Sequence, residues 1–216
     1  VLADKLQCGV DLHIDESIKN PGAGLNQLIH VLEDSNLKIP ITCSHSSSMS
    51  LLSSREVRYL ANRLASHNVG VIALPLTNNW LLGRQERETP VKRPLAPIKQ
   101  LQEAGVNVAI GGDNLQDPWF PLGNLDPISL MSSSMSLIQL APWERLGLSP
   151  YTTSAAAIMG LEWDCTIKSG SPANFVILDA SSWSECLSII PRRQHIINGD
   201  FFDENMSLVK PQLEIF

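Results

Sequence analysis

The sequence is poor in the features that mark nucleic-acid-binding, membrane-spanning and disulfide-stabilised proteins. Its 216 residues hold 16 Lys and Arg against 22 Asp and Glu, a net charge of −6, which argues against a basic face for nucleic acid. No apolar run reaches the roughly 18 residues that a transmembrane helix needs, and we expect no signal peptide and no membrane partner. The four cysteines form no C-x-x-C pair, so we expect reduced core thiols of a cytoplasmic protein at Cys8, Cys43, Cys165 and Cys186.

The first half of the chain alternates short apolar runs with amphipathic stretches, which predicts strands that alternate with helices. Apolar residues recur at helical spacing from Leu25 to Leu32, and Ser53 with Glu56 predicts a capping box before a second helical stripe. A third helix is predicted to open at Pro97. The strands are predicted at residues 8–14, 41–43, 71–76 and 106–110. This repeated βα pattern indicates a parallel sheet, either a barrel or a doubly wound sheet.

Four polar residues follow these strands at nearly equal spacing. They lie 32, 33 and 35 residues apart and are His13, His45, Asn78 and Asp113. In a parallel barrel all strands open their carboxyl ends on one face, where chemistry collects. A doubly wound sheet would often carry a glycine-rich phosphate loop, and the Gly-Gly pair before Asp113 is too short to be one. The spacing therefore favours the barrel.

These residue types fit metal-assisted hydrolysis. His13 can offer a neutral imidazole to a cation, Glu16 can shuttle a proton over the same edge, and Asp113 can bind a cation and accept a proton from water. Trp119 could pack against a flat substrate. Each residue taken alone also fits an ordinary strand-end, turn or packing role, and only their common register favours the hydrolase. The remaining histidines are predicted to be structural: His30, His67 and His195.

The pattern changes after Asp113. Helices are predicted at residues 128–140 and 153–159, followed by a β-hairpin over residues 167–178 whose turn contains Gly170 and Pro172. Asn198 and Gly199 predict a type I′ turn between two further short strands. We expect this tail to form a small β element of its own.

Four sequence motifs resemble the cytosine deaminase branch of the amidohydrolase superfamily. They are V-D-L-H-I-D-E, T-C-S-H-S-S-S-M, L-P-L-T-N-N-W-L-L-G-R and G-G-D-N-L-Q-D-P-W-F-P-L-G, in this order and spacing. A fifth stretch, G-S-P-A-N-F-V-I-L-D, resembles a strand of the small β-sandwich of that superfamily. The resemblance implies an α/β fold. Residues 1–160 would be strands 5–8 of a (β/α)8 TIM-type barrel, and residues 161–216 would be the C-terminal strands of the sandwich.

The resemblance also implies a role for each site residue. His13 would bind one divalent metal ion, Zn²⁺ or Fe²⁺, together with Asp113, which would also accept the proton of the metal-bound water. Glu16 would deliver a proton to the ring nitrogen of the substrate, and His45 would orient the metal-bound hydroxide or polarise the substrate. The implied reaction is hydrolytic deamination of a flat nitrogen heterocycle such as cytosine. The implied substrate contacts are Asn78, Asn114 and Trp119.

Two departures from the family pattern bear on these expectations. Asn114 stands where cytosine deaminases carry a second aspartate, which keeps isoguanine, creatinine and N-alkylamino-triazines open as substrates. No His-x-His motif occurs in the 216 residues, although the family places one on its first barrel strand. We therefore expect the N-terminal half of the same enzyme as a partner, and a homo-oligomer of the kind that relatives form. A catalytically silent half-barrel subunit is the alternative.

Overall fold

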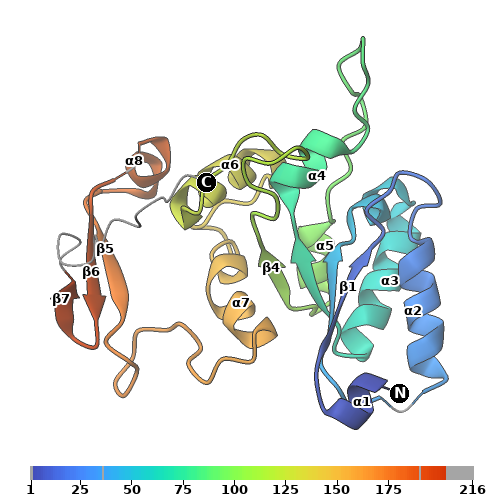
Figure 1. Cartoon of the computed structure of the whole chain (residues 1–216), viewed down its shortest axis with the longest axis horizontal. Coiled ribbons are helices and arrows are strands. Elements are labelled where there is room, and N and C mark those ends of the chain that lie inside the picture. Colours follow the sequence, from blue (N-terminus) through green and yellow to red (C-terminus); the bar gives the residue numbers. More distant parts are fainter. Residues whose placement is uncertain (1, 36, 190, 203–216) are drawn as a thin grey trace, which may run out of the picture. The chain divides into compact units, whose positions relative to one another are not determined.

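The chain divides into two compact units. The computed structural model describes residues 2–35, 37–189 and 191–202. The first unit is Val1–Cys165 and the second is Thr166–Phe216, so the division falls five residues after the predicted one at residue 160. In Figure 1 the colour of the first unit runs from blue to light orange and that of the second from orange to red.

A four-stranded parallel sheet forms the centre of the first unit (Figure 1). Its strands lie side by side in sequence order and are β1 (Val10–Ile14), β2 (Ile41–His45), β3 (Gly70–Ala73) and β4 (Val108–Ile110). The register pairs Leu12 with Cys43 and Ile14 with His45, so β1 and β2 end together. The parallel α/β sheet predicted from the repeated sequence pattern is confirmed.

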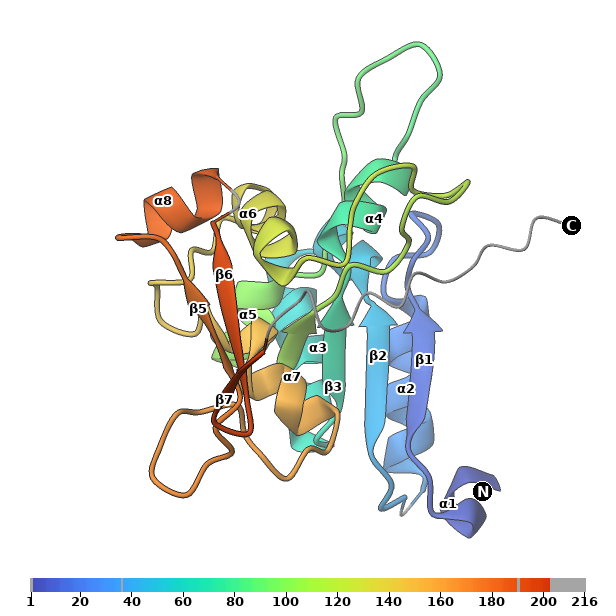
Figure 2. The same cartoon turned by 60° about the vertical axis from the view of Figure 1, so that its left-hand side comes forward.

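Helices cover one face of this sheet, as Figure 2 shows for the first two of them. They are α2 (Ala23–Glu33), α3 (Ser54–Ser66) and α5 (Ile98–Glu103). Their apolar stripes place Leu25, Leu60 and Leu101 in one buried core together with Val71 and Val108 of the sheet. Full burial of a side chain of this size stabilises the fold by about 1.5–3 kcal/mol. Each helix therefore carries apolar residues on its buried face, and their regular spacing makes the helix predictable from the sequence.

A capping box starts α3 where the sequence predicts it. The Ser53 Oγ accepts a hydrogen bond from Glu56 N at 3.3 Å, and the Glu56 Oε2 accepts one from Ser53 N at 3.0 Å. These bonds satisfy two amides that the helix itself leaves unpaired. We expect Ser53→Ala to lower the free energy of unfolding by about 1 kcal/mol, measured by urea denaturation of the purified protein. Ser54→Ala, one residue inside the helix, is the matched control, and an equal loss there would contradict the assignment.

The third predicted strand is shorter than expected, because a helix interrupts the apolar run V-I-A-L-P-L. β3 ends at Ala73, and α4 (Pro75–Leu81) begins two residues later. Pro75 occupies the first helical turn, where a missing N–H group does no harm because that group has no acceptor within the helix. The predicted strand over residues 71–76 is therefore wrong in its last residues. As a result, Asn78 lies on a helix and not at a strand end.

The rest of the first unit consists of short helices and loops. The predicted helices at residues 128–140 and 153–159 are confirmed as α6 (Pro127–Ile138) and α7 (Thr153–Ile158). Asp126 caps α6, since its Oδ1 accepts a hydrogen bond from Ile128 N at 2.9 Å. The remaining short helices are α1 (Leu2–Leu6), η1 (Ser47–Leu51) and η2 (Ser149–Tyr151).

The second unit holds an antiparallel sheet of order β5-β6-β7 and one helix. Its elements are β5 (Phe175–Leu178), α8 (Trp183–Ser188), β6 (Arg193–Ile197) and β7 (Asp200–Phe202). Asn198 and Gly199 have φ angles of 54° and 91°, as the predicted type I′ turn requires. The predicted hairpin over residues 167–178 is wrong, because β5 pairs with β6 and residues 167–174 form no strand. The sandwich prediction for residues 203–216 lies outside the described residues.

Every helix in the described part of the chain is too short or too polar to cross a lipid bilayer. All four cysteines are free thiols, as predicted, but only Cys43 and Cys186 are buried. Cys8 is exposed and Cys165 is half-buried, so the expectation of four core thiols is wrong for these two. Burial raises the pKa of the Cys43 thiol to about 12, which keeps it uncharged within the core.

Candidate metal centre

Two histidines meet at the carboxyl edge of the parallel sheet. His13 precedes the last residue of β1 and His45 ends β2, where the register sets it opposite Ile14. His13 Nδ1 lies 3.1 Å from His45 Nε2, and the two ring centroids are 4.9 Å apart. His45 is 2% exposed, whereas the His13 side chain is 65% exposed. The pair therefore has one buried member and one accessible member.

The backbone turns sharply at the end of β2. His45 and Ser46 have φ angles of 71° and 51°, in the left-handed region that costs about 1–2 kcal/mol for a residue with a side chain. Ser46 N donates to Ile14 O at 2.9 Å, and Ser48 N donates to Asp15 O, also at 2.9 Å. These bonds fasten the loop after β2 to the end of β1. Strained backbone that neighbouring contacts hold in place is common at functional sites. Here the two hydrogen bonds hold His45 in its position.

The adjacent acidic residues Asp15 and Glu16 have separate tasks. The Asp15 carboxylate accepts hydrogen bonds from Gly24 N and Leu25 N at 3.0 and 3.1 Å, so it caps the start of α2. The Glu16 Oε2 lies 3.6 Å from His45 Nε2, and the Glu16 side chain is 42% exposed. Three potential metal ligands thus have donor atoms within 4.8 Å of one another, and we call them the His–Glu cluster: His13, Glu16 and His45.

Asn78 of α4 contacts the other side of the His45 ring. It is 1% exposed, and its Nδ2 lies 3.0 Å from His45 Nδ1. An amide NH₂ group can only donate, so His45 Nδ1 is the acceptor. The substrate contact expected of Asn78 stays a prediction. In the structure this buried side chain contacts His45.

Burial lowers the pKa of His45 below its ordinary value. The carboxylates of Glu16 and Asp113 oppose this lowering. His13 adds to the lowering. Because the net direction is downward, the His45 ring is neutral at pH 7. A neutral imidazole has one N–H group and one lone pair, so it can act as a hydrogen-bond donor and as a ligand from different nitrogens.

Asp11 lies on the same face of β1 as His13, two residues earlier. Its carboxylate accepts hydrogen bonds from Thr42 Oγ1 at 2.8 Å and from Ser44 Oγ at 3.0 and 3.1 Å. Its Oδ2 lies 3.9 Å from His13 Nε2, the nitrogen that does not contact His45. A carboxylate that accepts a hydrogen bond from a metal-binding histidine orients it, but 3.9 Å is longer than a hydrogen bond. Asp11 is absent from the predicted site, although the strand period of two places it on the face of His13.

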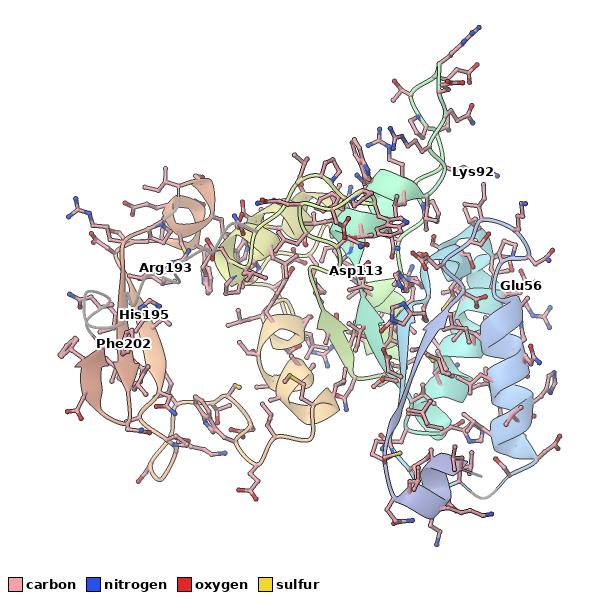
Figure 3. All side chains as sticks on the ribbon, in the orientation of Figure 1. Glu56, Lys92, Asp113, Arg193, His195 and Phe202 are labelled. Atoms are coloured by element: carbon pink, nitrogen blue, oxygen red, sulfur yellow. The ribbon has the colours of Figure 1, made fainter. Side chains whose placement is uncertain are left out.

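Asp113 lies three residues after the end of β4, at the carboxyl edge of the sheet (Figure 3). Its backbone has a φ of 61°, and its side chain is exposed. It acts on His45 electrostatically, but it is not part of the His–Glu cluster in the described residues. The prediction that His13 and Asp113 share one metal ion stays a prediction.

Two predicted substrate contacts in the loop after β4 are held in place by Asp117. Asn114 Nδ2 donates to Asp117 Oδ2 at 2.7 Å. Asp117 Oδ1 accepts from the backbone N–H groups of Trp119 and Phe120 at 2.9 and 2.8 Å. The bond from Phe120, followed by that from Asn114, holds the pKa of Asp117 below its usual range. The Trp119 side chain remains 60% exposed and accessible to a flat ring.

A cavity of about 740 Å³ lies between α4, α6 and the loop after β4. Its walls are largely apolar and include Trp80 and Phe120, whose rings meet edge to face with centroids 6.5 Å apart. Asp113 and Asn114 line the cavity, whereas the residues of the His–Glu cluster do not. The cavity therefore borders the candidate centre only at Asp113.

The chemistry of the His–Glu cluster fits a divalent transition metal. Imidazole nitrogen and carboxylate oxygen are ligands that Zn²⁺ and Fe²⁺ accept. The cluster is accessible on the side of His13 and Glu16, and a catalytic metal needs such an open position for water or substrate. The residues present are thus able to hold a metal at this edge of the sheet.

Parallel α/β proteins with metal-binding side chains at the carboxyl ends of their strands include many metal-assisted hydrolases. A model of the amidohydrolase family matches residues 1–195, which is most of the chain. The chain therefore belongs to the amidohydrolase family. This family contains metal-dependent hydrolases, in agreement with the donor set of the His–Glu cluster.

Three relatives illustrate the range of this family. The chain is 28% identical over 179 residues to a pterin deaminase of Rhizobium rhizogenes (strain K84), covering 83% of the chain and 41% of the relative. It is 32% identical over 91 residues to N-isopropylammelide isopropyl amidohydrolase of Pseudomonas sp. (strain ADP), covering 41% and 23%. It matches the crystal structure of 5-methylcytosine deaminase from Klebsiella pneumoniae with a TM-score of 0.80 and 25% identity, covering 94% and 49%. The chain spans less than half the length of each of these proteins.

Proposed function

We propose that this chain is the C-terminal half of a metal-dependent amidohydrolase that deaminates a flat nitrogen heterocycle. The observation that carries the proposal is the His–Glu cluster, which joins the ends of β1 and β2 at the carboxyl edge of a parallel sheet. Two similar proteins are named as deaminases, of pterin and of 5-methylcytosine, which supports this reaction class. In this proposal β1 to β4 are strands 5–8 of a (β/α)8 barrel.

The first half of that barrel would come from an N-terminal half of the same enzyme. Within the described residues β1 and β4 are the two edges of the sheet, and each is paired on one side only. Unpaired edges favour association with further strands, and a closed barrel would pair both. The greater length of the relatives supports this arrangement. The same segment would supply the His-x-His motif.

In the proposed mechanism His13 and Asp113 would hold the ion, and Asp11 Oδ2 lies 3.9 Å from His13 Nε2. A divalent metal, when bound, lowers the pKa of coordinated water from about 15.7 towards 7 and so supplies the nucleophile at neutral pH. Asp113 accepts the proton that the attacking water gives up. Glu16 donates a proton to the ring nitrogen, which makes the neighbouring carbon more electrophilic. A C–O bond would form, the C–N bond would break, and the amino group would leave as ammonia with the proton from Asp113. The proton that remains on the new hydroxyl group would return to Glu16 as the carbonyl forms, which restores both carboxyl groups.

Trp119 and Asn114 are the proposed substrate contacts. The exposed indole of Trp119 can stack on a flat ring, and Asn114 lines the cavity of about 740 Å³ together with Asp113. That space can hold a bicyclic ring as well as a pyrimidine. Cytosine, isoguanine and pterin are therefore the proposed substrate types.

A second candidate reaction is cleavage of another C–N bond, as in an N-alkylamino-triazine or creatinine. It is favoured by the 32% identity to N-isopropylammelide isopropyl amidohydrolase and by Asn114, whose uncharged amide differs from the second aspartate of cytosine deaminases. In this reaction an alkylamine would leave in place of ammonia when the substrate carries an N-alkyl group.

An assay for released ammonia tests the proposed function. The full-length protein, loaded with Zn²⁺ or with Fe²⁺, is offered cytosine, 5-methylcytosine, isoguanine, pterin, creatinine and an N-alkylamino-triazine. We expect ammonia from at least one amino-heterocycle, loss of the activity with a chelator and its return when metal is restored. Release of alkylamine alone would favour the second candidate. No release from any compound by a protein without bound metal would identify a silent half-barrel.

A further inference from the structure

We propose that Asn78 is a positioning residue that fixes the tautomer of His45, so that Nε2 carries the hydrogen and His45 acts as a donor at the site and not as a metal ligand. The proposal rests on the proposed function and gives a role to Asn78, which the sequence predicts only as a substrate contact. It starts from one contact, the 3.0 Å approach of Asn78 Nδ2 to His45 Nδ1 in a buried position.

The tautomer follows from the groups that face the two ring nitrogens. The NH₂ group of Asn78 has no lone pair to offer, so His45 Nδ1 must present its lone pair to it. A neutral imidazole then carries its single hydrogen on Nε2. His45 Nε2 lies 3.1 Å from His13 Nδ1, which can accept that hydrogen, and 3.6 Å from Glu16 Oε2.

The orientation of the Asn78 amide has its own physical reason. Its Oδ1 is buried and has no hydrogen-bond partner in the described structure. The structure gives Asn78 Nδ2 one partner, so the oxygen and the second N–H group are unpaired in the observed orientation. Turning the amide over would pair the oxygen but leave both N–H groups unpaired. Because buried N–H groups without an acceptor are rarer than buried C=O groups without a donor, the observed orientation is the better one.

A nitrogen that carries a hydrogen has no lone pair for a metal ion. With Asn78 in place, His45 Nε2 can therefore hydrogen-bond to a water or substrate oxygen at the site but cannot coordinate the metal. The ligands then have to come from His13 and other carboxylate or imidazole groups. Asn78 thus decides which of two histidines 3.1 Å apart binds the ion.

Two substitutions at residue 78 separate this role from simple packing. Asn78→Asp keeps the shape of the side chain but offers only acceptors when ionised, so it should draw the hydrogen to Nδ1 and free Nε2 as a ligand. Asn78→Leu keeps a similar volume without any polar group. A role in packing alone predicts that Asp is tolerated about as well as Leu and that neither changes the tautomer.

The tautomer can be read directly from the full-length protein after metal removal. In ¹⁵N-histidine-labelled protein at alkaline pH, the protonated and the unprotonated nitrogens of a neutral imidazole resonate far apart, and His45→Gln identifies the His45 signals. We expect hydrogen on Nε2 in the native protein and on Nδ1 in Asn78→Asp. Hydrogen on Nδ1 in the native protein overturns the proposal, even if neither variant folds. Hydrogen that remains on Nε2 in a folded Asn78→Asp variant overturns it as well.

Metal affinity and kinetics give a second readout. A carboxylate behind a metal-binding histidine changes metal affinity about 10–100-fold, so Asn78→Asp should bind Zn²⁺ more tightly by this factor or bind a second equivalent. We also expect kcat to fall more than KM rises, and to fall further in Asn78→Asp than in Asn78→Leu. Asn107→Asp, the same exchange on an exposed residue before β4, is the control and should change neither quantity. Unchanged Zn²⁺ binding in Asn78→Asp contradicts the proposal. If His45 carries its hydrogen on Nε2 as expected but the protein releases no ammonia from any substrate, the proposal about Asn78 holds and the proposed function is wrong.

Discussion

Replacing Glu16 by glutamine should remove most of the turnover and leave the metal in place. The glutamine amide has the size of the carboxyl group but cannot donate and recover a proton at neutral pH. General acid–base help of this kind is worth about 10²–10⁴-fold, so we expect a loss of kcat in that range. The Glu16 side chain is 42% exposed, and the exchange should therefore leave the fold intact. Steady-state kinetics and elemental analysis of the same sample measure the two effects.

This variant also separates two roles for Glu16 that the His–Glu cluster allows. If Glu16 is a proton donor, metal content stays at the native level while kcat falls. If Glu16 is a metal ligand, which its place within 4.8 Å of the histidine nitrogens permits, metal and turnover are lost together. Glu103→Gln, an exposed residue at the end of α5, is the matched control and should behave as the native protein. Full activity of Glu16→Gln would show that another group delivers the proton.

The elements of the first unit could be predicted because their signals are local. Leu25, Ile29 and Leu32 bury one face of α2 at helical spacing, and the strands stand out as apolar runs between such stripes. The common edge of His13 and His45 followed from the same pattern, because neighbouring parallel strands end at one edge. Their contact did not, because the register sets His45 opposite Ile14, and the left-handed backbone of His45, with a φ of 71°, brings the two rings together.

The role of Asn78 could not be predicted, because its partner lies 33 residues away along the chain. The sequence N-N-W does not say which of its two asparagines faces the core, and only the packing of α4 turns Asn78 inwards while Asn79 stays half-buried. The start of α4 was itself hidden in an apolar run. Proline is tolerated both in an edge strand and in the first turn of a helix, so Pro75 does not distinguish the two. Tertiary contacts decide which of them forms.

In the second unit the strand Phe175–Leu178 was predictable but its partner was not. The turn signal at Gly170 is local, whereas the strand pairs with Arg193–Ile197 across α8. One signal did point to α8. Ser182 Oγ accepts a hydrogen bond from Glu185 N at 3.1 Å, so Ser182 and Glu185 repeat the spacing of the capping box at α3.

The backbone at Asp113 limits the choice of a variant that tests its place in the site. Its φ of 61° lies in the left-handed region, where aspartate and asparagine are far more common than other residues with side chains. Alanine would add about 1–2 kcal/mol of backbone strain at this position, so a loss in Asp113→Ala would mix strain with chemistry. Asparagine keeps the backbone and the size and removes only the charge.

Asp113→Asn should therefore lose metal and turnover together. If Asp113 is an anionic ligand and the acceptor of the water proton, metal affinity should fall by more than about 100-fold, since even residues that only orient a ligand change it 10–100-fold. Asp34→Asn, on an exposed residue after α2, is the control, and metal titration beside steady-state kinetics is the measurement. Native metal affinity with lost turnover would reduce Asp113 to a proton acceptor. A native metal affinity and a native kcat in Asp113→Asn would mean that the His–Glu cluster binds the metal without Asp113. In that case Glu16→Gln should lose the metal, so the two variants together decide which carboxylate is the metal ligand.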